Sequence, residues 1–201
     1  MVVKLFPLSL VSSLKHRKYA ATEFVNTLKA DDLGLSVPRV HAYLEKRQGL
    51  RVSCVGIVFE ELQGYQELSR LLRRGIFSVE KCGTIAAETL AQLYAVGANH
   101  LDGRDANIMV HPETGQIRVI DWQFANFVAP RAEWLLEHLA GFHLQRSHEY
   151  RNYYLDSYWL QELHALSNHT SSIQLFRDRV VSLSKRKYSL GKRSKLTPLS
   201  G

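Results

Sequence analysis

The sequence predicts an α+β fold in which a small strand-rich part precedes a larger, mainly helical part. Short β-rich runs occupy residues 2–6, 37–44 and 51–62. Apolar residues at helical spacing dominate residues 78–96 and recur between 132 and 166. Between these helical stretches, residues 99–123 form a polar loop and two short β-rich runs that end on an aspartate. We expect the strand-rich part to span residues 1–62 and the helical part to span residues 63–181, followed by a basic tail over 182–201.

The strand-rich part begins with Val-Val-Lys-Leu-Phe, a predicted strand that contains a single lysine, Lys4. A helix is predicted next, capped by Ser12 or Ser13 and ended by Gly34. Glu23 lies beside the apolar stripe of this helix, 19 residues after Lys4. That separation suits an ion pair between a strand and a helix, and the alternative is an ordinary solvated glutamate. A turn over residues 46–49 would join the next two strands.

The helical part opens with a short amphipathic helix over residues 67–74 and a longer one over 78–96, which Gly97 ends. Further helices are predicted around residues 132–139 and over 150–166. The last of these is rich in large aromatic residues, which we assign to packing rather than to stacking on a sugar: Tyr153, Tyr154, Tyr158 and Trp159.

The loop between these helices has the order of a phosphoryl-transfer site. His100, Asp102 and Asn107 form the pattern His-x-Asp-x4-Asn, and Asp121 directly follows the apolar pair Val-Ile. The pattern is short, so its weight comes from its setting after a helix and before a hairpin. Phosphoryl transfer requires mainly an oriented acceptor hydroxyl and metal ions that neutralise phosphate charge. Asp102 would accept the hydroxyl proton, and the oxygens of Asn107 and Asp121 would bind Mg²⁺.

Three further residues of the loop need a role. Arg104 stands two residues after Asp102, where its planar guanidinium can pair with phosphate oxygens during catalysis. Asp105 competes with Asp102 for the role of catalytic base, but it stands only two residues before Asn107 and is out of pattern. His100 is assigned a structural hydrogen bond rather than proton transfer.

The segment resembles the catalytic loop and metal-binding aspartate of the protein-kinase-like superfamily. It is closer to the branch that phosphorylates sugars and small molecules, with an aminoglycoside-phosphotransferase-like loop. Asn-Ile-Met-Val, Val-Ile-Asp-Trp-Gln and the later run from Arg151 to Trp159 are similar to lipopolysaccharide core kinases that act on heptose or Kdo. The resemblance implies a two-lobe fold with a truncated amino-terminal β-lobe, ATP and Mg²⁺ as cofactors, and a role in lipopolysaccharide biosynthesis.

The same resemblance implies roles outside the loop. Lys4 would reach the α- and β-phosphates of ATP and be held by Glu23. The backbone groups of Glu60 and Leu62, at the end of the third strand, would receive adenine; an unremarkable strand end is the alternative.

The sequence also departs from the kinase pattern. It contains no G-x-G-x-x-G, and the lysine strand starts at residue 2, so we expect either a fragment, a shortened reading frame or a fold without that lid. Trp122 and Gln123 replace the Phe-Gly of D-F-G, and no A-P-E follows. These features favour a sugar or small-molecule acceptor over a peptide. They also keep open a pseudokinase-like protein that binds nucleotide without turnover.

Charge and cysteine content bear on partners and compartment. Eight of the 26 Lys and Arg residues, but one of the 19 acidic residues, lie from Arg177 onward. The tail from 182 has a composition typical of disorder. It would be a solvated end or contact an anionic membrane surface, with nucleic acid the less favoured partner. Cys54 and Cys82 lack C-x-x-C spacing and indicate a reducing, cytoplasmic compartment, with a peripheral position at the inner membrane face if the tail binds lipid.

Overall fold

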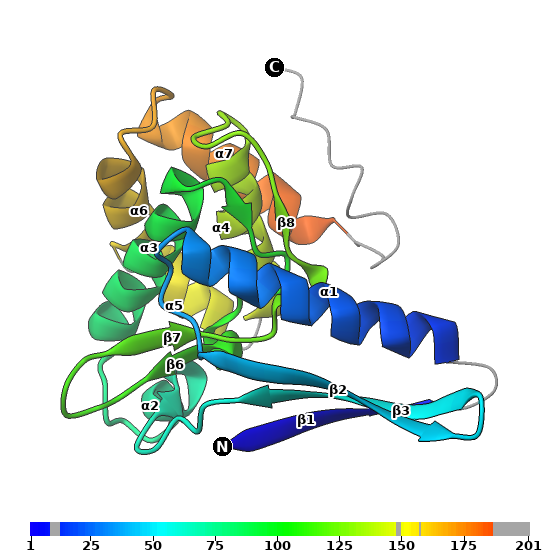
Figure 1. Cartoon of the computed structure of the whole chain (residues 1–201). Helices are drawn as coiled ribbons and strands as arrows, with labels where there is room; N and C mark the ends of the chain where they lie inside the picture. Colours follow the sequence, from blue (N-terminus) through cyan, green and yellow to red (C-terminus); the bar gives the residue numbers. More distant parts are fainter. Residues whose placement is uncertain (9–12, 148–149, 157, 187–201) are drawn as a thin grey trace.

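The computed structural model describes residues 1–8, 13–147, 150–156 and 158–186 (Figure 1). Its first layer is an antiparallel sheet of β1 (Val2–Pro7), β3 (Arg51–Phe59) and β2 (Val40–Gln48), in the order β1-β3-β2. Lys4 is paired with Ile57 on the central strand. Because side chains alternate along a strand, Lys4 and Phe6 share one face, and Val3 and Leu5 are exposed on the other.

Helix α1 (Ser13–Asp32) covers one face of this sheet (Figure 1). A small apolar cluster joins the helix to the sheet through Ala20 and Val55. The rings of Phe24 and Tyr43 meet edge to face with their centroids 5.6 Å apart, an ordinary distance for an aromatic pair. The helix therefore has a fixed position over β1 and its lysine.

The hairpin between β2 and β3 is tighter than the sequence predicts. The turn expected at residues 46–49 lies instead at Gly49 and Leu50, and Gln48 still pairs with Arg51. Gly49 has a φ of 62°, a conformation that glycine adopts without steric cost, so the chain reverses there. Residues 46–48 consequently extend β2.

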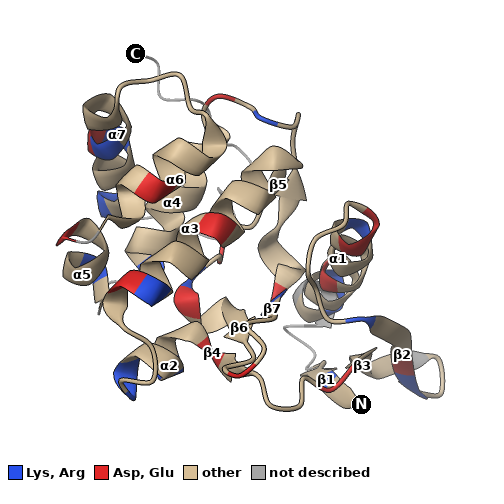
Figure 2. Ribbon diagram, turned by 90° about the vertical axis from the view of Figure 1, so that its left-hand side faces the viewer, with Lys and Arg blue, Asp and Glu red and all other residues tan. Residues whose placement is uncertain are grey.

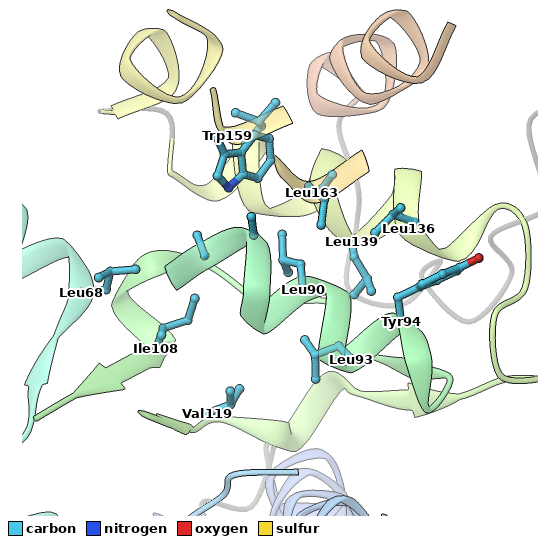
Figure 3. Packing of buried hydrophobic residues seen from close by; sticks show 14 of the residues in the cluster. Leu68, Leu90, Leu93, Tyr94, Ile108, Val119, Leu136, Leu139, Trp159 and Leu163 are labelled. Carbon is cyan, nitrogen blue, oxygen red and sulfur yellow. The ribbon is translucent and has the colours of Figure 1, made fainter. Parts of the chain in front are cut away.

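The helical lobe is built around α3 (Val79–Ala95). The other helices are α2 (Leu68–Arg73), α4 (Leu135–Arg146), α5 (Arg151–Asp156), α6 (Trp159–Ser167) and α7 (Ile173–Lys185). Figure 3 shows Leu90 and Leu93 of α3 among buried residues from α4, α6 and the short strands. Ser78 caps α3 by accepting from the Lys81 N–H at 3.2 Å, and Gly97, with a φ of 73°, follows its end as predicted.

The single helix predicted over 150–166 is two helices, α5 and α6. Tyr154 and Trp159 both pack on His143, with ring centroids 5.0 and 5.4 Å away. Five residues apart on one straight helix they would lie about 140° apart and could not both face the same ring. Tyr154 and Trp159 are buried, whereas Tyr153 and Tyr158 are exposed, so the packing role belongs to two of the four aromatic residues.

Helix α7 was not predicted. Ser172 caps it by accepting from the Leu175 N–H at 3.3 Å, and it packs closely on α4, where a Cβ on Gly141 would lie 2.6 Å from the Leu183 Cβ. Residues 182–185 therefore close this helix, so the described start of the predicted tail is helical. The rest of the tail, residues 187–201, lies outside the described residues.

Short strands frame the loop between α3 and α4. The predicted hairpin is formed by β6 (Ile108–Val110) and β7 (Ile117–Val119), and β4 (Gln66–Glu67) extends it. A separate pair joins β5 (Ala98–Asn99) to β8 (Asn126–Phe127). Two 3-10 turns, η1 (Asp105–Asn107) and η2 (Trp122–Phe124), complete the segment.

Figure 2 shows the two lobes from the side, with α1 and the three-stranded sheet facing the helical lobe across the β6–β7 hairpin. Within the described residues, no helix combines the length and apolar character needed to cross a bilayer.

Candidate active site

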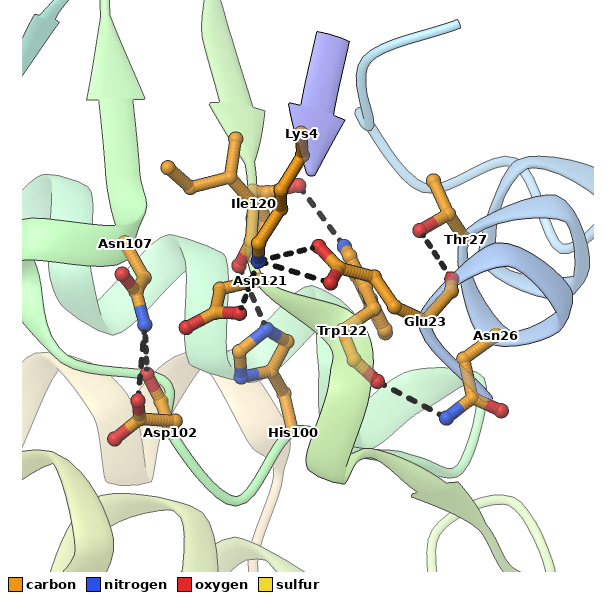
Figure 4. Close-up of polar contacts among 11 residues, drawn as sticks. Lys4, Glu23, Asn26, Thr27, His100, Asp102, Asn107, Ile120, Asp121 and Trp122 are labelled. Atoms are coloured by element: carbon orange, nitrogen blue, oxygen red, sulfur yellow. Dashed lines mark hydrogen bonds and ion pairs between the residues drawn. The ribbon is translucent and has the colours of Figure 1, made fainter. Parts of the chain in front are cut away.

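A three-residue ion network joins the two lobes (Figure 4). The Lys4 Nζ on β1 donates to Glu23 on α1, 2.9 Å from each carboxylate oxygen, and to the Asp121 Oδ1 at 2.9 Å. The Lys4 side chain is 38% exposed, while that of Glu23 is only 3% exposed. The structure thus contains the ion pair between Lys4 and Glu23 that the sequence predicts, and it adds a second carboxylate.

Sharing one ammonium between two carboxylates sets the charges of the network. Burial by itself lowers the pKa of Lys4, but the charges and hydrogen bonds of Glu23 and Asp121 outweigh it, so this pKa is raised above its ordinary value. Burial raises the pKa of Glu23, although the charge of Lys4 acts in the opposite direction. Lys4 consequently stays cationic at neutral pH and can pair with further anionic groups.

Asp121 has a left-handed backbone conformation, with φ 67° and ψ 57°, that residues other than glycine rarely adopt. Such strain costs about 1–3 kcal/mol and persists where surrounding contacts fix it. Here the next residue, Trp122, is buried, donates its Nε1–H to the Val119 carbonyl at 2.9 Å, and meets the ring of His100 at 4.7 Å. The indole therefore holds the segment that positions the Asp121 carboxylate.

His100 has a structural position, as its sequence context predicts. Its Nε2 lies 3.0 Å from the Ile120 carbonyl, which fixes the ring beneath the end of β7. Burial lowers the pKa of His100, although this hydrogen bond and the charges of Asp102 and Asp121 act in the opposite direction. The ring is thus neutral at pH 7 and links the loop to the segment that carries Asp121.

Asp102 and Asn107 lie on the opposite side of Asp121 from Lys4 and Glu23 (Figure 4). The Asn107 Nδ2 donates to the Asp102 carbonyl at 2.8 Å and approaches the Asp102 Oδ2 at 3.4 Å. The Asp102 side chain is 13% exposed, and its Oδ1 lies 3.4 Å from the Arg146 Nε at the end of α4. The structure thereby brings a partly accessible carboxylate next to the amide, as the motif requires.

The two remaining residues of the loop differ in environment. Arg104 has a buried Nε with no hydrogen-bond partner among the described residues, and its predicted contact with phosphate stays a prediction. Asp105 is buried behind the loop, where its Oδ1 accepts from the Ser147 hydroxyl at 2.9 Å and its Oδ2 accepts from the Tyr154 hydroxyl at 3.4 Å. Asp105 therefore anchors the loop to the helical lobe and does not face Asn107.

The oxygens left over in this arrangement suit Mg²⁺. The amide nitrogen of Asn107 is directed to Asp102, which leaves its Oδ1 as a ligand, and Asp121 uses only its Oδ1 toward Lys4. A hard cation that keeps several waters and takes one or two protein oxygens plus phosphates fits such a site. Among the described residues no group of three or more His, Cys, Asp or Glu side chains could by itself hold a metal ion.

A pocket of about 290 Å³ opens beside the ion network at the junction of the lobes. Its lining comes from β1, from the residues before β2, from the end of β3 and the linker after it, and from the residue before Asp121: Val2, Pro38, Phe59, Glu60, Glu61, Leu62 and Ile120. The Glu60 N–H donates to the Arg39 carbonyl at 2.9 Å, so its carbonyl is the group left for a ligand. The Leu62 carbonyl accepts from the Tyr65 N–H at 3.3 Å, which leaves the Leu62 N–H. One acceptor and one donor therefore border an otherwise apolar slot.

The structure adds two residues that sequence reasoning missed. Asn26 on α1 donates its amide hydrogens to the Trp122 and Ala125 carbonyls at 3.0 and 2.7 Å. Arg146 contacts Asp102 from α4. Neither lies in a motif, and the one available signal was the position of Asn26 three residues after Glu23, on the same face of the helix.

Comparisons with known proteins agree on the fold. No protein-family model matches the sequence, and a search of curated proteins found no match. WaaP, solved in complex with acyl carrier protein, has a TM-score of 0.53 at 16% identity, covering 90% of this chain and 79% of WaaP. WbdD, solved with the kinase inhibitor LY294002, has a TM-score of 0.56 at 22% identity.

The match to WbdD covers 95% of this chain and 43% of WbdD, so the chain spans less than half of that protein. A second WbdD structure, named as that of a bifunctional kinase-methyltransferase, has a TM-score of 0.52 at 20% identity and covers 95% of this chain and 42% of WbdD. At such identities the likeness concerns the fold. The chain therefore has the protein-kinase-like α+β fold that its sequence predicts, in the form shared by WaaP and WbdD.

Proposed function

We propose that this chain is an ATP- and Mg²⁺-dependent phosphotransferase that moves the γ-phosphoryl group to a hydroxyl of a sugar or another small molecule. The observation that carries the proposal is the network in which Lys4 bridges Glu23 and Asp121 beside the pocket at the lobe junction. A cation next to an apolar slot with one donor and one acceptor is the arrangement that an adenine nucleotide requires.

Each residue has a distinct role in this proposal. The Glu60 carbonyl and the Leu62 N–H bind the adenine edge, and Lys4 pairs with the α- and β-phosphates. Asn107 and Asp121 hold Mg²⁺, which would neutralise charge on the phosphates when bound. Asp102 orients the acceptor hydroxyl and takes its proton.

Arg104 lies in the same loop, two residues after Asp102. Its guanidinium pairs with the transferring phosphoryl group in this proposal. The acceptor class is inferred from the sequence resemblance to lipopolysaccharide core kinases. A core oligosaccharide that carries heptose or Kdo is the first acceptor to test.

The test is transfer of labelled phosphate from γ-labelled ATP to core oligosaccharides and related sugar acceptors in the presence of Mg²⁺. We expect Asp102→Ala to lower turnover by about 10²–10⁴, the usual contribution of a general base. Asp121→Ala should lower turnover and raise the Mg²⁺ concentration that the reaction requires, because the metal loses one of its two protein ligands. If both variants transferred phosphate at the wild-type rate, the assignment of the site would be refuted.

A second candidate is a pseudokinase-like protein that binds nucleotide without turnover. The sequence favours it in one respect, because it contains no G-x-G-x-x-G to cover the phosphates. Thermal unfolding with ATP and Mg²⁺ separates the two. A rise in melting temperature without phosphate transfer to any acceptor supports the second candidate, and transfer to an acceptor excludes it.

A further inference from the structure

A buried amide on α1, that of Asn26, forms hydrogen bonds with the segment that follows Asp121. Asn26 is 9% exposed, and its Nδ2 donates to the Trp122 carbonyl at 3.0 Å and to the Ala125 carbonyl at 2.7 Å. The two carbonyls belong to η2 and its C-cap, directly after Asp121. Both hydrogens of the amide are thus used, and both acceptors are backbone groups that no substitution in η2 removes.

Contacts on either side of Asn26 extend this attachment along one face of α1. About two turns before it, the rings of Tyr19 and Phe124 meet edge to face, with their centroids 5.2 Å apart. One turn after it, the Lys29 Nζ lies 4.4 Å from the centre of the Phe127 ring. These flanking contacts are aromatic or cation–π, whereas Asn26 contributes direct hydrogen bonds to the segment, and such bonds specify a register.

The other side of the same segment is attached to the helical lobe. Strand β8 pairs with β5, and the Val128 N–H donates to the Gly97 carbonyl at 2.9 Å. Gly97 permits this approach, because a Cβ there would collide with the Val128 carbonyl oxygen. The segment is therefore fixed on the helical lobe, and Asn26 joins α1 to that fixed surface.

Asn26 and Glu23 are three residues apart and share one face of a regular helix, so a shift of α1 at Asn26 also moves the Glu23 carboxylate. Misplacement of catalytic groups by about 1 Å can cost about 100-fold in rate. The contact of Lys4 with both carboxylates thus depends on how α1 is seated on η2.

We propose that Asn26 is a positioning residue that sets the register of α1 on the segment after Asp121 and so assembles the contact of Lys4 with Glu23 and Asp121 before any ligand binds. Its catalytic consequence rests on the proposed function, while its structural consequence does not.

The structural consequence is tested without activity. Asn26→Leu keeps the branching of the side chain and removes the donors. Thr27→Val is the matched control, since Thr27 is also buried on α1 but its hydroxyl donates only to the Glu23 carbonyl within the helix, at 2.7 Å. We expect Asn26→Leu, but not Thr27→Val, to raise the acylation rate of Lys4 and to speed amide hydrogen exchange over residues 122–127, both read by mass spectrometry on folded protein.

The functional consequence is tested through the metal. Wild-type protein should bind ATP more tightly with Mg²⁺ than in EDTA. In Asn26→Leu this gain should fall by about tenfold or more and turnover by about 100-fold. Adenosine affinity, which depends on the Glu60–Leu62 pocket and on no phosphate contact, should stay within about twofold. Thr27→Val should retain the wild-type Mg²⁺ gain.

Asn26→Asp supplies a signature that loss of stability alone does not give. The introduced carboxyl can donate to one carbonyl only while protonated, and ionised it would face two carbonyl oxygens. Its Mg²⁺ gain relative to wild type should therefore rise as pH falls, under conditions where both proteins remain folded.

The outcomes separate the two claims. Unchanged Lys4 acylation and unchanged exchange over 122–127 in Asn26→Leu would overturn the positioning role, whatever the nucleotide data show. If the Mg²⁺ gain of Asn26→Asp relative to wild type does not change with pH, that result would also count against the positioning role. If Lys4 acylation and amide exchange over residues 122–127 change as expected while wild-type protein binds no ATP, the proposed function fails and the positioning role stands.

Discussion

Asp102 and Asp105 stand three residues apart in one loop, and substitutions at the two positions should separate catalysis from stability. Asp105 is 4% exposed and accepts hydrogen bonds from Ser147 and Tyr154. Asp102 is partly accessible and faces Asn107. We expect Asp105→Ala to lower the free energy of unfolding and Asp102→Asn to lower turnover.

The magnitude for Asp105 follows from its two hydrogen bonds. A bond to a charged group contributes about 1.5–3 kcal/mol, and a buried donor that loses its acceptor costs about 1–3 kcal/mol. The bond from Ser147 has an ordinary length of 2.9 Å, while that from Tyr154, at 3.4 Å, is long and weaker. Asp105→Ala should therefore lower the free energy of unfolding by about 3 kcal/mol. Asp105→Asn keeps an oxygen for Ser147 and should cost about 1 kcal/mol.

The magnitude for Asp102 is smaller in stability and larger in rate. Its partner Arg146 is 37% exposed and lies 3.4 Å away, so this ion pair contributes about 0–1 kcal/mol. The shorter bond from Asn107, at 2.8 Å, goes to the Asp102 backbone carbonyl, which Asp102→Asn leaves in place. Stability should change by less than about 1 kcal/mol, whereas loss of a general base should lower turnover by about 10²–10⁴.

Urea unfolding followed by circular dichroism gives the first quantity, and transfer from labelled ATP under saturating acceptor gives the second. The reasoning fails if Asp105→Asn remains folded yet loses as much turnover as Asp102→Asn. It also fails if Asp102→Asn is as destabilised as Asp105→Ala, because that result would make Asp102 the structural anchor.

Three further predictions concern stability and ligand binding. Burial lowers the pKa of His138 to about 4, so on acidification this residue is protonated in the unfolded state before it is protonated in the folded state. The free energy of unfolding should therefore fall by up to about 3 kcal/mol as pH drops from about 6.5 to about 4. Urea unfolding should show this acid sensitivity in wild type and less of it in His138→Leu. Gly97→Ala should lower the melting temperature far more than Gly115→Ala, since both glycines have positive φ but only Gly97 has a backbone atom in the way; equal shifts would contradict this. Lys4→Met should weaken ATP binding at least tenfold by calorimetry and lower the free energy of unfolding by about 1–3 kcal/mol, because Glu23 loses its cation; unchanged affinity would remove Lys4 from the nucleotide site.

Local signals in the sequence were sufficient for most elements. The long helix α3 has an apolar stripe within residues 78–96 and a glycine stop at residue 97, and the structure follows both. The β6–β7 hairpin and the aspartate after it were predicted in the same way. Each of these features is encoded within about 20 residues, where the spacing of side chains alone specifies the geometry.

Prediction was poorer where distant contacts decide the outcome. The break between α5 and α6 depends on His143, which Tyr154 and Trp159 both contact, and α7 depends on the close approach of Leu183 to Gly141 on α4. No local pattern reports either partner. Such tertiary packing routinely overrides helical propensity.

The sequence by itself determined the kinase-like loop, because His100, Asp102, Asn107 and Asp121 fall within 22 residues and their spacing is local. It also predicted an ion pair between Lys4 and Glu23, with a solvated glutamate as the alternative. Only the tertiary structure decided that Lys4 also meets Asp121, 117 residues away, and that Asn26 seats α1 on the segment behind that aspartate. The physical reason is that hydrogen bonds and ion pairs require specific distances and directions, and packing of the two lobes supplies these where sequence separation does not.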